Sequence, residues 1–90
     1  MIDDLGKLDA RRKRLLMRAN RCGIHENDIL LGGFAKARIA ELDLARLEEL
    51  DALMQENDID VFQWITRKKP APAAYETPLM DMVRAFNKID

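Results

Sequence analysis

Apolar residues recur along most of the chain at intervals of three and four, the spacing that places side chains on one face of an α-helix. The clearest run follows Thr77 and Pro78, which are a typical N-cap and first helical residue. Its apolar positions are Leu79, Met82, Val83 and Phe86. Runs of β-branched residues, which would favour strands, are absent from the sequence. The pattern therefore predicts an all-α protein.

Five helices are expected, joined by short turns into a compact, bundle-like single domain over residues 1–90 with frayed ends at 1–8 and 87–90. The expected helices cover Asp9 to Cys22, Glu26 to Leu42, Leu44 to Glu56, Ile59 to Arg67 and Pro78 to Phe86. Each is preceded or begun by a residue that caps helices well, except the second. The expected caps are Asp9, Asp43, Asn57 or Asp58, and Thr77.

Apolar surface on the second and third helices is expected to come from Ile29, Leu30, Leu31, Phe34, Ala35 and Ile39 and from Leu44, Leu47, Leu50, Leu53 and Met54. Gly32 and Gly33 lie inside the second of these helices, where each glycine costs up to about 1 kcal/mol relative to alanine. A close helix–helix crossing with no room for a larger side chain would compensate. Between Arg67 and Thr77, Pro70 and Pro72 exclude a continuous helix.

Charge is balanced in sum but segregated along the chain. The 90 residues carry 15 Lys and Arg against 16 Asp and Glu, a net charge of −1. Six cations and no acid stand between Arg11 and Arg21, whereas eight acids and a single cation stand between Glu41 and Asp60. Two explanations remain open at this point. The two faces attract each other inside the domain, or one of them steers a partner of opposite charge.

The sequence offers little for catalysis or metal binding. It has one cysteine, Cys22, one histidine, His25, and no serine. A structural zinc site needs four ligands, and no second Cys–His pair is present. Paired carboxylates lie in a run typical of a solvated face, and no glycine-rich phosphate loop occurs. We therefore expect no catalytic, cofactor-binding or metal-binding residues, although a redox or metal module built on Cys22 and His25 is a conceivable alternative.

Nucleic acid and membrane are not expected as partners. The presumed recognition helix after the basic helix begins with Glu26 and Asp28, where phosphate would sit. The longest apolar runs are far shorter than the ~18 residues of a membrane span. Acids at Asp3 and Asp4 are unlike a basic presequence, and a single cysteine suits a reducing compartment. A cytoplasmic location in a bacterium is the expectation.

Several segments of the chain look familiar. The stretch Arg21 to Lys36, RCGIHENDILLGGFAK, resembles the succinate dehydrogenase assembly factor family, the small FAD assembly factors of bacteria and mitochondria. The likeness continues at Asp58 to Trp64, at Lys69 to Pro72 and from Leu79 to Phe86. It covers residues 14–88, and the segments agree in order and spacing.

The resemblance implies a protein that is not an enzyme. It implies that the chain binds the flavoprotein subunit of succinate dehydrogenase and promotes covalent attachment of FAD to a histidine of that subunit, with fumarate reductase as a further client. FAD itself is not expected to stay bound to this chain, which is expected to be a monomer when free. In a eukaryote the resemblance implies the mitochondrial matrix.

The signature of this family is Arg-Gly-x-x-Glu at the joint of the first two helices, which faces the flavoprotein. Gly23 and Glu26 match it, while Cys22 stands at the arginine position. Physically, a glycine allows the sharp reversal between two helices, and a carboxylate is favoured near a helix N-terminus. The residues that the resemblance implies for partner binding are Arg18, Arg21, Cys22, Gly23, Ile24, His25, Glu26 and Asp28. The alternative function is a small helical regulator that binds another protein or DNA through its basic first helix.

Overall fold

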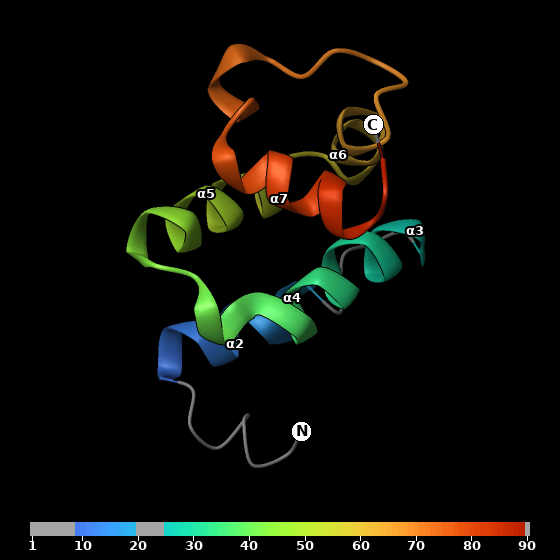
Figure 1. Cartoon of the computed structure of the whole chain (residues 1–90). Helices are drawn as coiled ribbons and strands as arrows, with labels where there is room; N and C mark the ends of the chain where they lie inside the picture. Colours follow the sequence, from blue (N-terminus) through green and yellow to red (C-terminus); the bar gives the residue numbers. More distant parts are fainter. Residues whose placement is uncertain (1–8, 20–24, 90) are drawn as a thin grey trace.

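A computed structural model describes residues 9–19 and 25–89 of the chain (Figure 1). Within these ranges the regular structure is helical throughout and contains no strand, which confirms the all-α prediction. The radius of gyration, 12.2 Å, is about that of a folded domain of this length. The expectations for residues 1–8, 20–24 and 90, frayed N-terminal residues included, lie outside the described residues.

Five long helical segments follow one another, with one short 3₁₀ turn between the last two. The segments are α2 (Ala10–Ala19); the run of α3 (His25–Asn27), η1 (Asp28–Gly32), α4 (Gly33–Arg38) and η2 (Ile39–Glu41); α5 (Leu44–Met54); α6 (Asp58–Ile65); and α7 (Pro78–Phe86). The short turn is η3 (Ala73–Tyr75). Figure 1 shows α2 and α4 lying together at one side of the molecule, with α5, α6 and α7 at the other.

The predicted caps are confirmed at four helix starts. Asp9 Oδ1 accepts from the backbone N–H of Arg12 at 2.8 Å, and Asp43 and Thr77 do the same for α5 and α7. At α6 the cap is Asn57, which accepts from two backbone N–H groups. Each cap satisfies N–H groups that have no partner within the helix, which is why these starts are encoded locally.

The second helix differs in kind from the prediction. Its middle, η1, is a π-helical segment, and its last turn, η2, is a 3₁₀ helix. π-helical turns inside α-helices are rare and often mark functional sites. Gly33 is not required by a tight crossing, since a Cβ there would lie 3.7 Å from Phe86 Cε2, an ordinary contact distance. The expectation that no larger side chain fits is therefore wrong at Gly33.

The core is formed by side chains from all five long segments. The fully buried large residues are Leu31, Phe34, Leu47, Leu50, Leu53, Val61, Ile65, Leu79 and Met80, together with Val83 and Asn27. Phe34 meets Phe86 edge to face, with ring centroids 5.9 Å apart. This edge-to-face contact joins α4 to the end of α7 and so ties the two sides of the molecule together.

Two residues that were expected in the core are on the surface. Ile29 is 57% exposed and Leu44 is 66% exposed. Ile29 lies two residues from each of the buried residues Asn27 and Leu31. Two helical steps turn a side chain by about 200°, so Ile29 points to the opposite face. Leu42, just before the Asp43 cap, is buried in place of Leu44.

The aromatic residues of α6 and η3 pack on each other. Trp64 and Tyr75 stack with ring centroids 5.3 Å apart and an interplanar angle of 18°, and both lie against the core. The Tyr75 hydroxyl donates to Glu56 Oε2 at 2.7 Å, and this hydrogen bond raises the pKa of Tyr75. The rings thus fix the proline-containing connection between α6 and α7.

The last residues before the C-terminus are held by polar and apolar contacts. Asn87, the C-cap of α7, donates through Nδ2 to the carbonyl oxygens of Leu30 and Val83 at 3.1 and 2.9 Å. Ile89 packs against the core. We expected frayed ends at residues 87–90, but 87–89 include these anchoring contacts because Leu30 lies in the π-helical segment beside α7.

Candidate functional site

Four of the residues expected to bind a partner fall within the described residues, at the end of α2 and the start of the second helical run. Arg18 is one residue before the end of α2, His25 and Glu26 begin α3, and Asp28 opens the π-helical segment. The others, which are Arg21, Cys22, Gly23 and Ile24, lie outside the described residues. We refer to Arg18, His25, Glu26 and Asp28 together as the corner.

The corner is accessible to a partner. Arg18, His25 and Glu26 are exposed, and Asp28 is half-buried. Glu26 lies in the first turn of the run from His25 to Glu41 and makes no hydrogen bond or ion pair with residues 9–19 or 25–89. A carboxylate in this place is favoured by the helix dipole by roughly 0.3–1 kcal/mol. The carboxylate of Glu26 is therefore exposed, and no residue among 9–19 and 25–89 binds it.

Arg18 also has a structural role. Its guanidinium lies 3.4 Å from Asp51 Oδ1 and donates to the Met54 carbonyl oxygen at 3.3 Å. Asp51 and Met54 are near the end of α5, so these bonds hold α2 against α5. Because both side chains of the ion pair are well exposed, the pair contributes little to stability by itself.

Asn27 is the buried residue that holds the start of the second helical run against α6, and it was not identified from the sequence. Asn27 is 1% exposed, and its Nδ2 donates to the carbonyl oxygen of Asp58, 31 residues away, at 2.9 Å. Asp58 is the first residue of α6, so this bond ties α3 to α6. The spacing in the sequence does indicate that Asn27 is buried. It lies four residues before Leu31 in a series that continues with the apolar residues Ala35 and Ile39.

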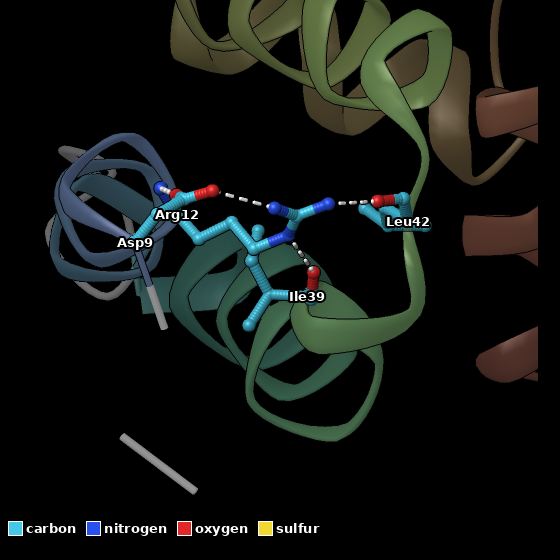
Figure 2. Close-up of polar contacts among 4 residues, drawn as sticks. All are labelled: Asp9, Arg12, Ile39 and Leu42. Carbon is cyan, nitrogen blue, oxygen red and sulfur yellow. Dashed lines mark hydrogen bonds and ion pairs between the residues drawn. The ribbon is translucent and has the colours of Figure 1, made fainter. Parts of the chain in front are cut away.

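The basic first helix is partly consumed by contacts within the molecule. The Arg12 guanidinium donates through Nε to the Ile39 carbonyl oxygen at 3.1 Å, and also to the Leu42 carbonyl oxygen and to Asp9 (Figure 2). Figure 2 shows the Arg12 guanidinium between Asp9 at the start of α2 and the carbonyl groups of Ile39 and Leu42. Arg12 therefore fixes the packing of α2 and does not serve a partner.

Some acids of the run from Glu41 to Asp60 also make contacts that hold the fold together. Glu49 Oε1 accepts from the backbone N–H of Leu79 at 3.1 Å, so α5 caps the start of α7. Glu49 also pairs with Arg46 at 2.9 Å. Arg84, only 3% exposed, bridges Glu76 and the Trp64 carbonyl oxygen. These contacts do not join the basic run to the acidic run. The Arg18–Asp51 ion pair does, so the two runs attract each other at that pair, and steering of a partner stays a prediction.

The described residues hold no group of three or more His, Cys, Asp or Glu side chains that could bind a metal ion. No helix in residues 9–19 and 25–89 has the length and apolarity that a membrane crossing requires. What the fold presents is a small helical domain with an exposed charged corner, which is the form of a protein-binding module. The class defined by fold and site is therefore an interaction protein.

The comparison with known families identifies the family to which this chain belongs. The model of the family described as "Flavinator of succinate dehydrogenase" matches residues 13–87 of this chain. The chain belongs to this family, which confirms the resemblance seen in the sequence. The family match covers α3 to α7 completely and α2 from Lys13 onward.

Curated relatives carry a consistent name. Succinate dehydrogenase assembly factor 2 of Dictyostelium discoideum is 34% identical over 88 residues, which are 98% of this chain and 62% of that protein. The factor of the same name from Danio rerio is 40% identical over 83 residues, 90% of this chain and 52% of that protein. The chain therefore spans between about half and three fifths of the length of these relatives. Both are named as mitochondrial assembly factors, in agreement with the prediction that this chain is not an enzyme.

Proposed function

We propose that this chain assists the assembly of succinate dehydrogenase by binding its flavoprotein subunit and promoting covalent attachment of FAD to that subunit. The match to the flavinator family over residues 13–87 supports the proposal. The structural observation that supports binding at the corner is Glu26, which is exposed at the start of a helical run and is not paired with any residue among 9–19 and 25–89. The alternative of a regulator acting through the basic helix gains no support from the family, and Arg12 of that helix is already engaged.

In this proposal the chain makes and breaks no covalent bond. The flavin supplies its own reactivity and the client supplies the histidine nucleophile. The chain holds the client in the reactive arrangement, and orientation alone can lower a barrier by several kcal/mol. It can favour a client conformation only by the difference between its affinities for the two states. The corner is a suitable binding surface for this, because the buried Asn27 beside Glu26 and Asp28 bonds α3 to the first residue of α6.

The remaining expectations belong to the same proposal. FAD stays with the client and is not held stably by this chain, the free chain is a monomer, and fumarate reductase is a further client. The relatives named above are mitochondrial, so we propose the mitochondrial matrix for the chain in a eukaryote and the cytoplasm in a bacterium.

The test is a complementation experiment in cells that lack this protein. Covalent flavin in the flavoprotein subunit is measured by in-gel fluorescence after expression of wild type, Glu26→Ala or Glu48→Ala. Glu48 is an exposed acid on α5, far along the chain from the corner, and is the matched control. We expect wild type and Glu48→Ala to restore fluorescence and Glu26→Ala to restore much less. Normal covalent flavin in cells without the protein would refute the proposed function.

A further inference from the structure

A groove runs between α2 and α5 beside the corner. Its lining residues are Arg11, Arg14, Leu15, Arg18, Asp51 and Gln55, and its volume is about 570 Å³. Three arginines form the α2 wall, and Asp51 and Gln55 belong to the α5 side. Arg18 lines the groove and is also one of the residues expected to bind a partner.

The arginines line the groove because of helical geometry. Residues at i, i+3 and i+7 share one face of a helix, at about 100° per residue. Arg11, Arg14 and Arg18 have this spacing. Arg12 is turned by one helical step toward Ile39 and Leu42, where its guanidinium is bound. The α2 helix thus divides its cations between a structural face and a groove face.

The groove carries more positive charge than the chain itself neutralises. Arg18 pairs with Asp51 at 3.4 Å. Arg11 and Arg14 have no ion pair within 4 Å and no side-chain hydrogen bond among residues 9–19 and 25–89, although the charge of Arg11 helps to lower the pKa of Asp9. Like charges one turn apart on a helix repel each other. The local repulsion is relieved when a ligand brings carboxylates between them.

From this arrangement we infer that the α2–α5 groove docks an acidic segment of the client protein, a stretch of polypeptide with Asp or Glu side chains. This inference rests on the proposed function and extends its surface from the corner along α2. Arginine forks on one wall suit carboxylates. On the other wall, Asp51 Oδ1 accepts from Arg18 and from Gln55 Nε2, which leaves Asp51 Oδ2 and Gln55 Oε1 as acceptors for the backbone N–H groups of a polypeptide.

A polypeptide fits the groove better than a nucleic acid does. A phosphate backbone brings a regular line of charge with few donors, and Asp51 in the groove together with the neighbouring acids of α5 repels it. A protein segment can place its isolated carboxylates against the arginines and its backbone donors against α5. Because one wall carries cations and the other carries hydrogen-bond acceptors, the groove favours a polypeptide over a nucleic acid.

The experiment measures binding of purified, flavin-free flavoprotein subunit to the full chain by calorimetry, at low and at moderate salt. The test variant is Arg11→Gln with Arg14→Gln. The control is Lys13→Gln with Lys36→Gln, which removes the same charge from exposed positions outside the groove. We expect the arginine variant to bind about tenfold more weakly or worse, since hydrogen bonds to charged groups are lost. Its affinity is also expected to depend less on salt.

The outcomes separate the two proposals. If wild type does not bind the flavoprotein, the proposed function falls and the groove proposal falls with it. If wild type binds and the arginine variant loses no more affinity than the lysine control, the groove proposal alone is overturned. Binding of duplex DNA that requires Arg11 and Arg14 would also overturn it. Because neither arginine side chain has an ion pair or hydrogen bond among residues 9–19 and 25–89, the variant should unfold at the same temperature as wild type, and a loss of affinity is then a surface effect.

Discussion

Arg12 Nε donates to the carbonyl oxygen of Ile39 at 3.1 Å, across 27 residues of chain. The same guanidinium reaches the Leu42 carbonyl oxygen and Asp9 (Figure 2). Carbonyls at the end of a helix have no partner within that helix. One side chain therefore satisfies the end of the second helical run and holds it to α2, while Arg11, Arg14 and Arg18 line the groove on another face of α2.

Replacement of Arg12 should destabilise the protein more than replacement of any exposed cation on α2. Arg12→Ala is expected to lower the free energy of unfolding by about 2 kcal/mol, since two carbonyl oxygens lose a charged donor. Arg12→Lys should lose most of the same amount, because a single ammonium cannot reproduce the fork. Urea unfolding followed by circular dichroism measures both, with the exposed Lys13→Ala as control. Equal stability of the Arg12→Ala and Lys13→Ala variants would contradict the structural role.

Asp9 should make stability depend on pH in the acid range. The backbone N–H of Arg12 and then the Arg12 charge lower the pKa of Asp9 from its usual 3.8. The folded-state pKa lies below the unfolded one, so the contribution of the carboxylate is present above pH 3.8 and is lost as the pH falls through the folded value.

Asp9→Asn isolates that charge, because asparagine is an equally good cap. Thermal unfolding of wild type and Asp9→Asn should differ near neutral pH and converge at low pH. A difference that stays constant down to about pH 2 would show that the charge is not responsible.

Substitutions of Asn27 should lower the free energy of unfolding, even when the new side chain has nearly the same shape. Asn27→Ala leaves the Asp58 carbonyl oxygen without its donor and is expected to cost about 1–3 kcal/mol. Asn27→Asp should cost more, because it buries a carboxylate against a carbonyl oxygen. Chemical unfolding gives the stabilities, and Asn87→Ala, which removes a different side-chain-to-carbonyl bond, is the comparison. An Asn27→Asp protein as stable as wild type would exclude the bond to Asp58 as the anchor of the corner.

Gly33→Ala should stabilise the protein. The backbone at Gly33, with φ −62° and ψ −45°, is helical, and the added methyl would lie 3.7 Å from Phe86 Cε2. Alanine is favoured over glycine within a helix by about 1 kcal/mol, so a gain of up to that amount is expected. The reverse change at an exposed position of the same helix, Ala37→Gly, should lose a similar amount. Destabilisation by Gly33→Ala would reveal a steric need for glycine.

The resemblance in the sequence implies an arginine at the position of Cys22, and Cys22→Arg is a prediction from the sequence alone. A planar guanidinium in place of the thiol would gain charge-assisted hydrogen bonds with the flavoprotein. Its affinity should rise by about 1–3 kcal/mol if those bonds are buried. Calorimetry with the flavoprotein subunit checks this, with Cys22→Ala as the control for loss of the thiol. Unchanged or weaker binding of the arginine variant would count against a contact at this position.

The predictable part of the fold was the part made by neighbouring residues. Asp9, Asp43, Asn57 and Thr77 were recognisable as caps because each bonds a backbone N–H within three residues of itself. The π-helical turn at Asp28–Gly32 left no recognisable mark, since its apolar residues fit an α-helix equally well. Apolar character alone also misplaced Ile29, because burial depends on which face the neighbouring helices cover.

The candidate site likewise has a part that the sequence predicted and a part that only the structure showed. The corner residues were found through a family pattern in the sequence, whereas Asn27, Arg12 and the α2–α5 groove emerged from the packing. By itself, the sequence determined the helices, their capped starts and the family, since these follow from contacts a few residues apart. Only the tertiary structure decided which arginines are bound and which are free. That choice depends on carbonyls and carboxylates about 30 residues away, which packing alone brings within reach.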